Sequence, residues 1–279
     1  MIKYKSILRW VGSKKRLINH IIQNLPQNIN NYYEPFLGSA IVYLYISCKK
    51  AYINDYNRDL INIYKQIKTN YLDLIILLEE YYKQYMSSND TKQYYLQKRE
   101  QFNKFKNKYT VERAALYIFI NKTCYNGLMQ FNKYDLNTSG FGKLNNPKIC
   151  DLKNMEILYN KLNKNTIIKN QDYLLFLKNV KKGDFIYLDP PYVPDDIKAC
   201  NIKYIKNGWD IQDFDNLVNL CNKLSDIGCY FMLSNSNSDY IRKNFPKDKY
   251  NIKELEVNRG LCPTSKLRQK ETELLIMNY

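Results

Sequence analysis

The sequence lacks the features that mark several large classes of protein. It contains no apolar run of the length that crosses a bilayer, and Met1–Lys5 does not begin a signal peptide. We therefore expect no membrane partner and no secretion, so that the protein stays in the cytoplasm where it is made. His20 is the only histidine, which argues against a zinc site and a histidine-based triad; no metal is expected.

The cysteines show no pattern of a disulfide framework or a metal site. Their number is odd, and none forms a Cys-x-x-Cys pair. We expect reduced thiols that pack as small apolar side chains. The seven cysteines are at positions 48, 124, 150, 200, 221, 229 and 262.

Acidic residues are outnumbered by basic ones, and the formal net charge is +16. Such a charge suits a polyanionic partner, above all nucleic acid, although a chain rich in Lys, Asn, Ile and Tyr is also what an AT-rich genome produces. Residues 58–149 hold fifteen Lys and Arg and eight Asp and Glu. The excess is densest in the middle of the chain, which indicates a basic surface on a folded body and not a basic tail.

The order of apolar segments predicts an α/β fold. Up to residue 57 a strand, a glycine turn, a helix over 40–48 and a second strand form a βαβ unit. Further strands are expected at 166–169, 184–188, 229–233 and 273–277, and a helix at 213–227. We predict one Rossmann-like sheet domain made of residues 1–57 and 150–279.

The middle segment, residues 58–149, has a different pattern of apolar residues. Leu60–Tyr85, Gln93–Phe105 and Val111–Asn121 show helical periodicity. After residue 127 the sequence is short, polar and punctuated by glycine, which indicates a hairpin or loop near 128–142. We predict a helical domain inserted into the sheet domain.

The strongest chemical signal is an apolar strand that ends in Asp189-Pro190-Pro191-Tyr192. Ligands of open α/β sheets bind at the carboxyl edge of the strands. Consecutive prolines stiffen the turn and fix the directions of its carbonyls. The alternative is a plain structural turn after a strand.

These four residues fit the methylation of an exocyclic amine, whose lone pair is delocalised into the purine ring. If Asp189 accepts one N–H and the carbonyl of Pro190 the other, the nitrogen becomes tetrahedral and its lone pair can attack a methyl group. Tyr192 offers a ring on which a flipped base stacks. We therefore predict Asp189, Pro190, Pro191 and Tyr192 as the catalytic centre.

A cofactor site is expected at Glu34–Ala40. Gly38 lets a ligand approach the strand-to-helix turn, and Asp55 follows the next strand, where an acid hydrogen-bonds ribose hydroxyls. The segment lacks the three-glycine fingerprint and the P-loop lysine, so phosphate binding is not indicated. S-adenosylmethionine (SAM) has a ribose and no phosphate, so it fits a site with an acid for the ribose hydroxyls and no phosphate-binding motif. Read alone, Asp55 is equally a turn or helix-cap residue.

Taken together, the motifs resemble those of the Dam-type DNA adenine-N6 methyltransferases, including members of restriction–modification systems. The resemblance implies a SAM-dependent methyltransferase sheet, a target-recognition domain at 58–149, duplex DNA as substrate and a location with that DNA. It covers nearly the whole chain in the family's order: Leu8–Lys14, Glu34–Ala40, Asn54–Asn57, Asn121–Leu128, Asp189–Tyr192, Leu233–Ser236 and Glu273–Tyr279.

The resemblance also implies roles for particular residues. Asp189 is expected to serve both cofactor and target amine. Asp172 is a looser match for the acid near the adenine of the cofactor, and this role is favoured over the alternative, a helix cap. The turn Tyr125–Gly127 is also a physically sound helix end. Cofactor contacts are expected from Trp10, Lys14, Glu34, Phe36, Gly38, Asp55, Asp172 and Asp189. DNA contacts are expected from Arg9, Tyr125, Asn126, Gly127, Leu128 and Gln130.

The sequence departs from the family where DNA is expected to be read. Gln130 stands where many members have arginine, Arg9 where some have lysine, and Asp135–Gly142 replaces a Gly-Glu-Phe-Asn-Val-Pro-Phe-Gly hairpin. Arginine reads guanine bidentately whereas glutamine prefers adenine, so we expect a recognition sequence other than GATC. A cognate restriction endonuclease is a further expected partner, and a monomer is favoured.

Two other functions fit part of the pattern. Related acid-Pro-Pro-aromatic turns serve RNA and protein amino methyltransferases, although the inserted domain argues against those substrates. A DNA-binding protein with a dead catalytic site is the second alternative. The intact set of Trp10, Lys14, Asp55 and Asp189 argues against it.

Overall fold

The computed structural model describes residues 4–194, 209–258 and 270–279. They form two compact units, each built from three stretches of chain. Unit 1 contains the N-terminal residues as far as Lys15, Leu37–Tyr45 and Asn54–Gln171. Unit 2 contains Arg16–Phe36, Ile46–Ile53 and the described part of Asp172–Tyr279. The helical segment expected at 58–149 thus belongs to a unit that also holds the glycine turn.

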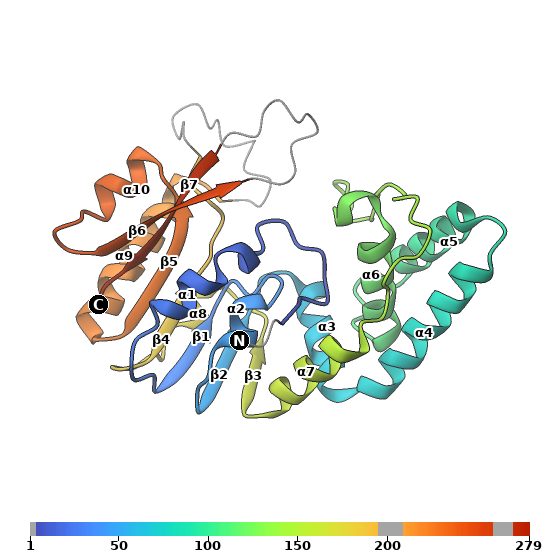
Figure 1. Cartoon of the computed structure of the whole chain (residues 1–279), viewed down its shortest axis with the longest axis horizontal. Coiled ribbons are helices and arrows are strands. Elements are labelled where there is room, and N and C mark those ends of the chain that lie inside the picture. Colours follow the sequence, from blue (N-terminus) through green and yellow to red (C-terminus); the bar gives the residue numbers. More distant parts are fainter. Residues whose placement is uncertain (1–3, 195–208, 259–269) are drawn as a thin grey trace. The chain divides into compact units, whose positions relative to one another are not determined.

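Seven strands form one sheet in the order β3-β2-β1-β4-β5-β7-β6 (Figure 1). The strands are β1 (Asn31–Glu34), β2 (Lys50–Asn54), β3 (Thr166–Lys169), β4 (Phe185–Leu188), β5 (Tyr230–Ser236), β6 (Asn251–Asn258) and β7 (Lys270–Met277). β2, β1, β4 and β5 run parallel, whereas β7 is antiparallel to β5 and β6. The first five strands have the doubly wound order, which reverses between β1 and β4, where such sheets bind ligands. The predicted Rossmann-like α/β fold is confirmed.

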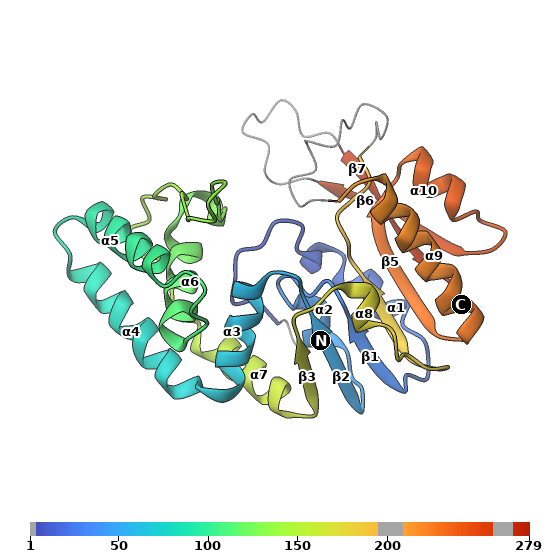
Figure 2. The same ribbon diagram turned by 180° about the vertical axis from the view of Figure 1, so that it is seen from behind.

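In unit 2 the core lies between the sheet and the helices that pack on it. The helices of this unit are α1 (Ile18–Gln23), α8 (Tyr173–Phe176), α9 (Ile211–Ile227) and α10 (Asp239–Asn244). α8 and α9 pack over β4 and β5 (Figure 2). Every residue of β4 is buried, as expected for a central strand of a parallel sheet. The core therefore fixes the end of β4, from which the Asp-Pro-Pro-Tyr turn departs.

Unit 1 is mainly helical. Its helices are α2 (Ile41–Tyr45), α3 (Arg58–Thr69), α4 (Tyr71–Ser87), α5 (Thr91–Lys104), α6 (Val111–Thr123) and α7 (Leu152–Asn163). Leu60–Tyr85 is two helices and not one, because the backbone at Asn70 turns away from helical geometry with φ −129° and ψ 44°. Asparagine competes with the helical backbone through its own side chain; here its Nδ2 donates to Oε1 of Gln66 at 2.6 Å.

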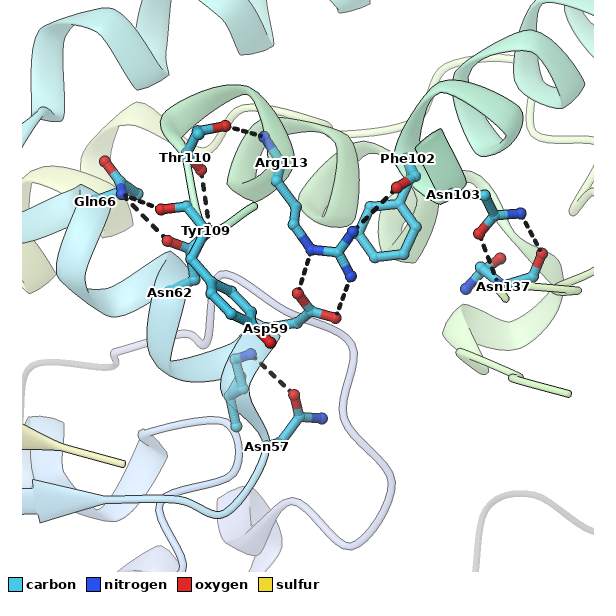
Figure 3. Close-up of polar contacts among 11 residues, drawn as sticks. Asn57, Asp59, Asn62, Gln66, Phe102, Asn103, Tyr109, Thr110, Arg113 and Asn137 are labelled. Carbon is cyan, nitrogen blue, oxygen red and sulfur yellow. Dashed lines mark hydrogen bonds and ion pairs between the residues drawn. The ribbon is translucent and has the colours of Figure 1, made fainter. Parts of the chain in front are cut away.

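A buried ion pair joins three helices of unit 1 (Figure 3). Arg113 on α6 donates through Nε and Nη2 to the two carboxylate oxygens of Asp59 on α3, at 2.5 and 2.8 Å. Its Nη1 donates to the carbonyl of Phe102 on α5 at 3.0 Å, and its guanidinium lies over that ring. Removing one partner of such a buried pair costs about 3–5 kcal/mol. Arg113 thus holds α3, α5 and α6 together.

Some elements differ from the sequence-based expectation. The helix expected over 40–48 is the shorter α2, which begins after Ala40, a residue with a φ of +57°, and ends at Tyr45. α7 and β6 were not predicted: α7 follows a polar loop, and β6 is largely exposed with no apolar run.

The described residues include five free cysteines, at positions 48, 124, 150, 221 and 229. Cys200 and Cys262 lie outside the described part of the chain. Within that part, no helix is both long enough and apolar enough to span a membrane. No group of three His, Cys, Asp or Glu side chains that could hold a metal ion occurs among the residues described.

Candidate functional site

The conformation of the glycine turn that precedes α2 depends on Gly38. Its φ is +48°, and a Cβ at this position would lie 2.8 Å from Nε1 of Trp10. The site therefore demands glycine for both its backbone conformation and its close neighbour. The hydroxyl of Tyr64 donates to the Gly38 carbonyl at 2.7 Å. Trp10 and Gly38, far apart in sequence, are thus neighbours in unit 1.

Asp55 follows β2 directly, and its carboxylate joins the glycine turn to the start of α3. Oδ2 accepts from the N–H of Gly38 and Oδ1 from the N–H of Asn57, both at 2.9 Å. Burial raises the pKa of Asp55 from 3.8 to about 6, although the backbone hydrogen bonds pull it down. Each carboxylate oxygen retains capacity for a further hydrogen bond, so the group can also accept from a ligand hydroxyl.

Two further residues of unit 1 hold backbone carbonyl groups. Lys14 begins a 3-10 turn at Lys14–Arg16, is buried, and donates from Nζ to the carbonyl of Gly12 at 2.7 Å. Asn170, which we did not predict from the sequence, donates from Nδ2 to the Asp55 carbonyl at 2.7 Å. A single asparagine after a short strand carries little signal in the sequence. The structure shows that it fixes the backbone at Asp55.

The other predicted cofactor residues belong to unit 2. Glu34 ends β1 and is buried, and its Oε2 accepts from the hydroxyl of Tyr32 at 2.6 Å. The ring of Phe36 lies 5.2 Å from that of Tyr173 and 5.7 Å from that of Trp209. These residues form an aromatic cluster beside the end of β1.

Asp172 is the N-cap of α8. Its Oδ1 accepts from the N–H groups of Leu174 and Leu175 at 2.8 and 3.3 Å. The helix-cap interpretation is therefore confirmed. A contact with the cofactor stays a prediction.

The Asp-Pro-Pro-Tyr turn continues from the buried end of β4. Asp189 is half-buried and Pro190 is buried. The hydroxyl of Tyr192 donates to Oε2 of Glu273 on β7 at 2.7 Å. Burial first, and then the nearby carboxylates of Asp189 and Glu273, raise the pKa of Tyr192 far above its usual range. The phenol is therefore neutral and fixed in orientation, and two acids lie close to it.

Residues at the end of β5 hold the chain just beyond the turn. β4 and β5 are in register with Leu188 opposite Leu233, so their carboxyl ends lie side by side. Oδ1 of Asn235 accepts from the N–H of Val193 at 3.0 Å, and Oγ of Ser236 donates to the Val193 carbonyl at 2.5 Å. These residues and Glu273 were quoted in family motifs but given no role. The feature of the sequence that could have identified them is a polar side chain within a strand that is otherwise apolar.

The segment predicted to contact DNA is an exposed turn followed by a loop. Tyr125–Gly127 forms a 3-10 turn in which Asn126 has a φ of +52°, and the Tyr125 side chain is 63% exposed. The expected hairpin is reduced to isolated bridges, of which one pairs Phe131 with Asn137. Gln130 is exposed, while Leu128 is half-buried.

Side chains of α5 anchor this loop. Tyr95 and Arg99 donate to the carbonyl of Ser139 at 2.8 and 2.7 Å. Asn103 and Asn137 exchange two hydrogen bonds, in which Asn103 Oδ1 accepts at 2.8 Å and its Nδ2 donates at 3.1 Å (Figure 3). The loop is therefore held by long-range polar contacts that no local pattern in the sequence predicts.

Arg9 lies against the same turn. A Cβ on Gly127, whose φ is +70°, would lie 2.4 Å from the Cβ of Arg9, so the Arg9 side chain covers the glycine. Lys122 is close by: burial, and then the charge of Arg9, lower its pKa to about 8. The structure thus brings together Arg9 and Tyr125–Gly127, which were all predicted to contact DNA. Two basic side chains that interact with each other, those of Arg9 and Lys122, thus lie at this turn.

Comparison with known proteins gives a consistent answer. The family model for the D12 class N6 adenine-specific DNA methyltransferases matches residues 10–261. The chain is 36% identical to the Type II methyltransferase M.MjaIII of Methanocaldococcus jannaschii over 100% of both chains. It is 33% identical to the Type II methyltransferase M1.LlaDCHI of Lactococcus lactis subsp. cremoris, covering 100% of this chain and 96% of the relative.

A more distant relative is the DNA adenine methylase of Vibrio cholerae serotype O1, which is 27% identical over 99% of this chain and 97% of its own. The family model and the full-length relatives agree with the resemblance read from the motifs. The chain belongs to the D12 class N6 adenine-specific DNA methyltransferase family.

Proposed function

We propose that this enzyme takes its methyl group from SAM, delivers it to N6 of an adenine in duplex DNA, and reaches that adenine by flipping it out of the helix. The family assignment supports DNA adenine as the acceptor, against the RNA or protein alternatives. The observation that carries the cofactor proposal is the bonded pair of Gly38 and Asp55, with Trp10 against the same turn.

The residues around Gly38 fit SAM. The Asp55 carboxylate is fixed by two backbone N–H groups and can still accept from ribose hydroxyls. The indole of Trp10 offers an apolar face beside a turn that has no Cβ. We assign Trp10, Lys14, Gly38 and Asp55 to the cofactor, and we extend this proposal to Glu34, Phe36 and Asp172 of unit 2. When bound, SAM supplies an electrophilic methyl group on a sulfonium.

The Asp-Pro-Pro-Tyr turn is proposed to activate the amine. The Asp189 carboxylate accepts one N–H of the adenine amine and the Pro190 carbonyl accepts the other, so that the lone pair is released from the ring. As nitrogen bonds to the methyl carbon, the bond from that carbon to sulfur breaks and the amine becomes cationic. Asp189 would stabilise this positive charge, and the amine would then pass one proton to solvent water, while the sulfur leaves as a neutral thioether. Pro191 keeps the turn stiff.

Tyr192 is proposed to hold the flipped base through its ring. Because its hydroxyl is bound by Glu273, the plane of the ring is defined before any base arrives. A fixed aromatic face is what stacking on an extrahelical base requires. Glu273 and Asp189 also give this part of unit 2 a negative potential that suits a cationic cofactor.

DNA recognition is assigned to Arg9 and the turn and loop that follow α6. The exposed ring of Tyr125 and the amide of Asn126 suit stacking and base-edge contacts in the space that a flipped base leaves. Gln130 is exposed on the loop and favours adenine over guanine. We therefore propose a recognition sequence other than GATC.

Partnership with a restriction endonuclease is a second proposal. It is supported by two relatives at 33% and 36% identity that are Type II methyltransferases. The enzyme would act as a monomer, in whichever compartment holds the DNA of its host or replicon. Protection of host DNA from an endonuclease specific for the same site would test this.

The test of the main proposal is transfer of labelled methyl from SAM to duplex DNA and, in parallel, to single-stranded RNA. We expect N6-methyladenine in DNA alone, at a defined sequence found by sequencing the methylated product. Modification at every GATC and nowhere else would contradict the proposed change of site. DNA binding without any transfer would favour a catalytically dead homologue.

A further inference from the structure

Two adjacent residues near the N-terminus touch two different functional segments of unit 1. Arg9 covers Gly127 in the DNA-contact turn, and Trp10 lies against Gly38 in the cofactor turn. Both contacts are so close that a Cβ on either glycine would overlap the neighbouring side chain. A displacement of this short segment would therefore change the contacts at both turns.

The peptide backbone of Arg9 is held by one buried side chain, that of Asn121 on α6. Oδ1 of Asn121 accepts from the N–H of Arg9 at 2.8 Å, and its Nδ2 donates to the Arg9 carbonyl at 2.9 Å. The same Nδ2 donates to the carbonyl of Gly127 at 3.1 Å. Asn121 is fully buried; its bond to Gly127 is buried and its two bonds to Arg9 are partly buried, so they are costly to break.

Only a primary amide satisfies this arrangement. It offers an acceptor on one side and two N–H donors on the other, matching one backbone N–H and two backbone carbonyls. A carboxylate has no donor for the carbonyls, and an aliphatic side chain would leave all three backbone groups without this partner. Asn121 thus acts as a latch: it closes the segment of Arg9 onto the turn that contains Gly127.

We propose that Asn121 is a positioning residue that couples cofactor binding to DNA binding. The inference rests on the proposed function, because it takes Trp10 and Gly38 as cofactor contacts and Arg9 and Gly127 as DNA contacts. A cofactor that orders Trp10 also orders Arg9, and the latch transmits that order to Gly127. Bound cofactor then raises the affinity for DNA. Bound DNA raises the affinity for the cofactor by the same factor, because linkage between two binding sites is reciprocal.

The chain offers a matched control in Asn62 on α3. It is also a buried asparagine of unit 1, and its Nδ2 donates to a backbone carbonyl, that of Thr110, at 3.0 Å (Figure 3). The hydrogen bonds of its amide are with Thr110 and Gln66, and not with the Arg9 segment or the Gly127 turn. Asn62→Ala therefore removes a comparable buried hydrogen bond without opening the latch.

The experiment measures the Kd for duplex DNA with and without S-adenosylhomocysteine, for wild type, Asn121→Ala and Asn62→Ala. We expect the cofactor product to tighten DNA binding about fivefold or more in wild type and in Asn62→Ala, a typical coupling between sites. In Asn121→Ala the ratio of the Kd without S-adenosylhomocysteine to the Kd with it should fall close to one. If Asn121→Ala does not fold, Asn121→Asp takes its place. It keeps the shape of the side chain but loses both donors, so it should also show a ratio of Kd values close to one.

A spectroscopic readout reports the latch without catalysis. The chain has two tryptophans, Trp10 and Trp209, so Trp209→Phe leaves Trp10 as the only one. In that background, DNA added without cofactor should change the Trp10 emission, and adding Asn121→Ala should remove the change.

Several outcomes would overturn the proposal. One is a wild-type ratio of one with unchanged Trp10 emission, in a protein that binds both ligands. Another is an equal loss of coupling in Asn62→Ala, and a third is full coupling in Asn121→Ala. A wild type that binds neither S-adenosylhomocysteine nor DNA would instead refute the proposed function, so the two failures are distinguishable.

Discussion

The turn Asp189–Tyr192 and the loop Tyr125–Gly142 are held in place by different means. The turn leaves a strand whose residues are all buried, contains two prolines, and is fixed by three short hydrogen bonds from β5 and β7. The loop is exposed at Tyr125 and Gln130 and has little secondary structure of its own. Its shape depends on side chains of α5 that bond its backbone.

This difference supports the proposal that the turn carries the chemistry and the loop carries the choice of target. The geometry of the turn depends on the packed core of the sheet, where most substitutions are costly. The loop can exchange side chains without altering the sheet. The departures from the family pattern at Gln130 and Asp135–Gly142 fall in the loop, whereas Asp189–Tyr192 is intact. We infer that the turn decides whether methyl is transferred, and the loop decides where.

The largest effect is expected for Asp189→Ala. Loss of the carboxylate that accepts from the amine should lower the rate of methyl transfer by about 10²–10³ or more, the effect of removing one preorganised polar group. DNA affinity, measured by fluorescence anisotropy, should stay within about twofold, since affinity depends mainly on contacts made elsewhere. A loss of DNA affinity as large as the loss of rate would break the comparison between turn and loop.

The next effect concerns the cofactor turn. Gly38→Ala combines a φ of +48° with a Cβ that would lie 2.8 Å from Trp10 Nε1, so we expect a cost of about 1–3 kcal/mol and a weaker SAM affinity by calorimetry. Gly12→Ala is the control, because Gly12 has a φ of +76° but no atom within 4 Å of an added Cβ. Equal losses in both variants would show that backbone strain, and not the Trp10 contact, matters.

A smaller effect is expected at the ring proposed to hold the base. Tyr192→Phe keeps the ring but removes the hydroxyl that donates to Glu273, a bond to a charged group worth about 1.5–3 kcal/mol. We expect kcat to fall about tenfold or more. Glu273→Gln keeps an acceptor and should lose less. Steady-state kinetics in which Tyr192→Phe equals wild type would mean that ring orientation is set by packing alone.

The smallest effect is a pH dependence from Asp55, whose pKa is raised to about 6 by burial. Ribose hydroxyls need the carboxylate as acceptor, so SAM affinity should rise with pH through about 6, by up to about tenfold between pH 5 and pH 7. The folded state holds this proton more tightly than the unfolded chain. Its contribution to the free energy of unfolding therefore falls as pH rises from about 4 to about 6.

Asp55→Ala supplies the control for this titration. It should bind SAM weakly with a flat pH profile over the same range, and its unfolding free energy should lose the dependence that Asp55 causes. Calorimetric titration and chemical denaturation at several pH values measure the two effects. A wild-type affinity that falls as pH rises through about 6 would contradict the role of the carboxylate.

The fold and the position of the Asp-Pro-Pro-Tyr turn at a strand end were largely predictable because their signals are local. An apolar run that meets Asp189-Pro190 marks a strand end, and Gly38 with Asp55 marks the first βαβ unit. The break between α3 and α4 was missed because apolar periodicity continues through Asn70. β6 was missed because it is an edge strand in which polar and charged residues predominate.

The supports of the site were not predictable for a different reason. Asn121, Asn235 and Glu273 act through partners more than forty residues away. Nothing in the local pattern says which backbone group a buried asparagine will bond. Such residues become visible only when the fold has placed both partners.

The most direct test of the central claim is a map of N6-methyladenine in DNA modified by wild type and by Gln130→Ala, read by methylation-sensitive sequencing. If the loop chooses the site, Gln130→Ala should keep methyl transfer and spread it to related sequences, with discrimination at one base weakened by about 1–3 kcal/mol. An unchanged recognition sequence, or a loss of transfer at all sites like that expected for Asp189→Ala, would contradict the account.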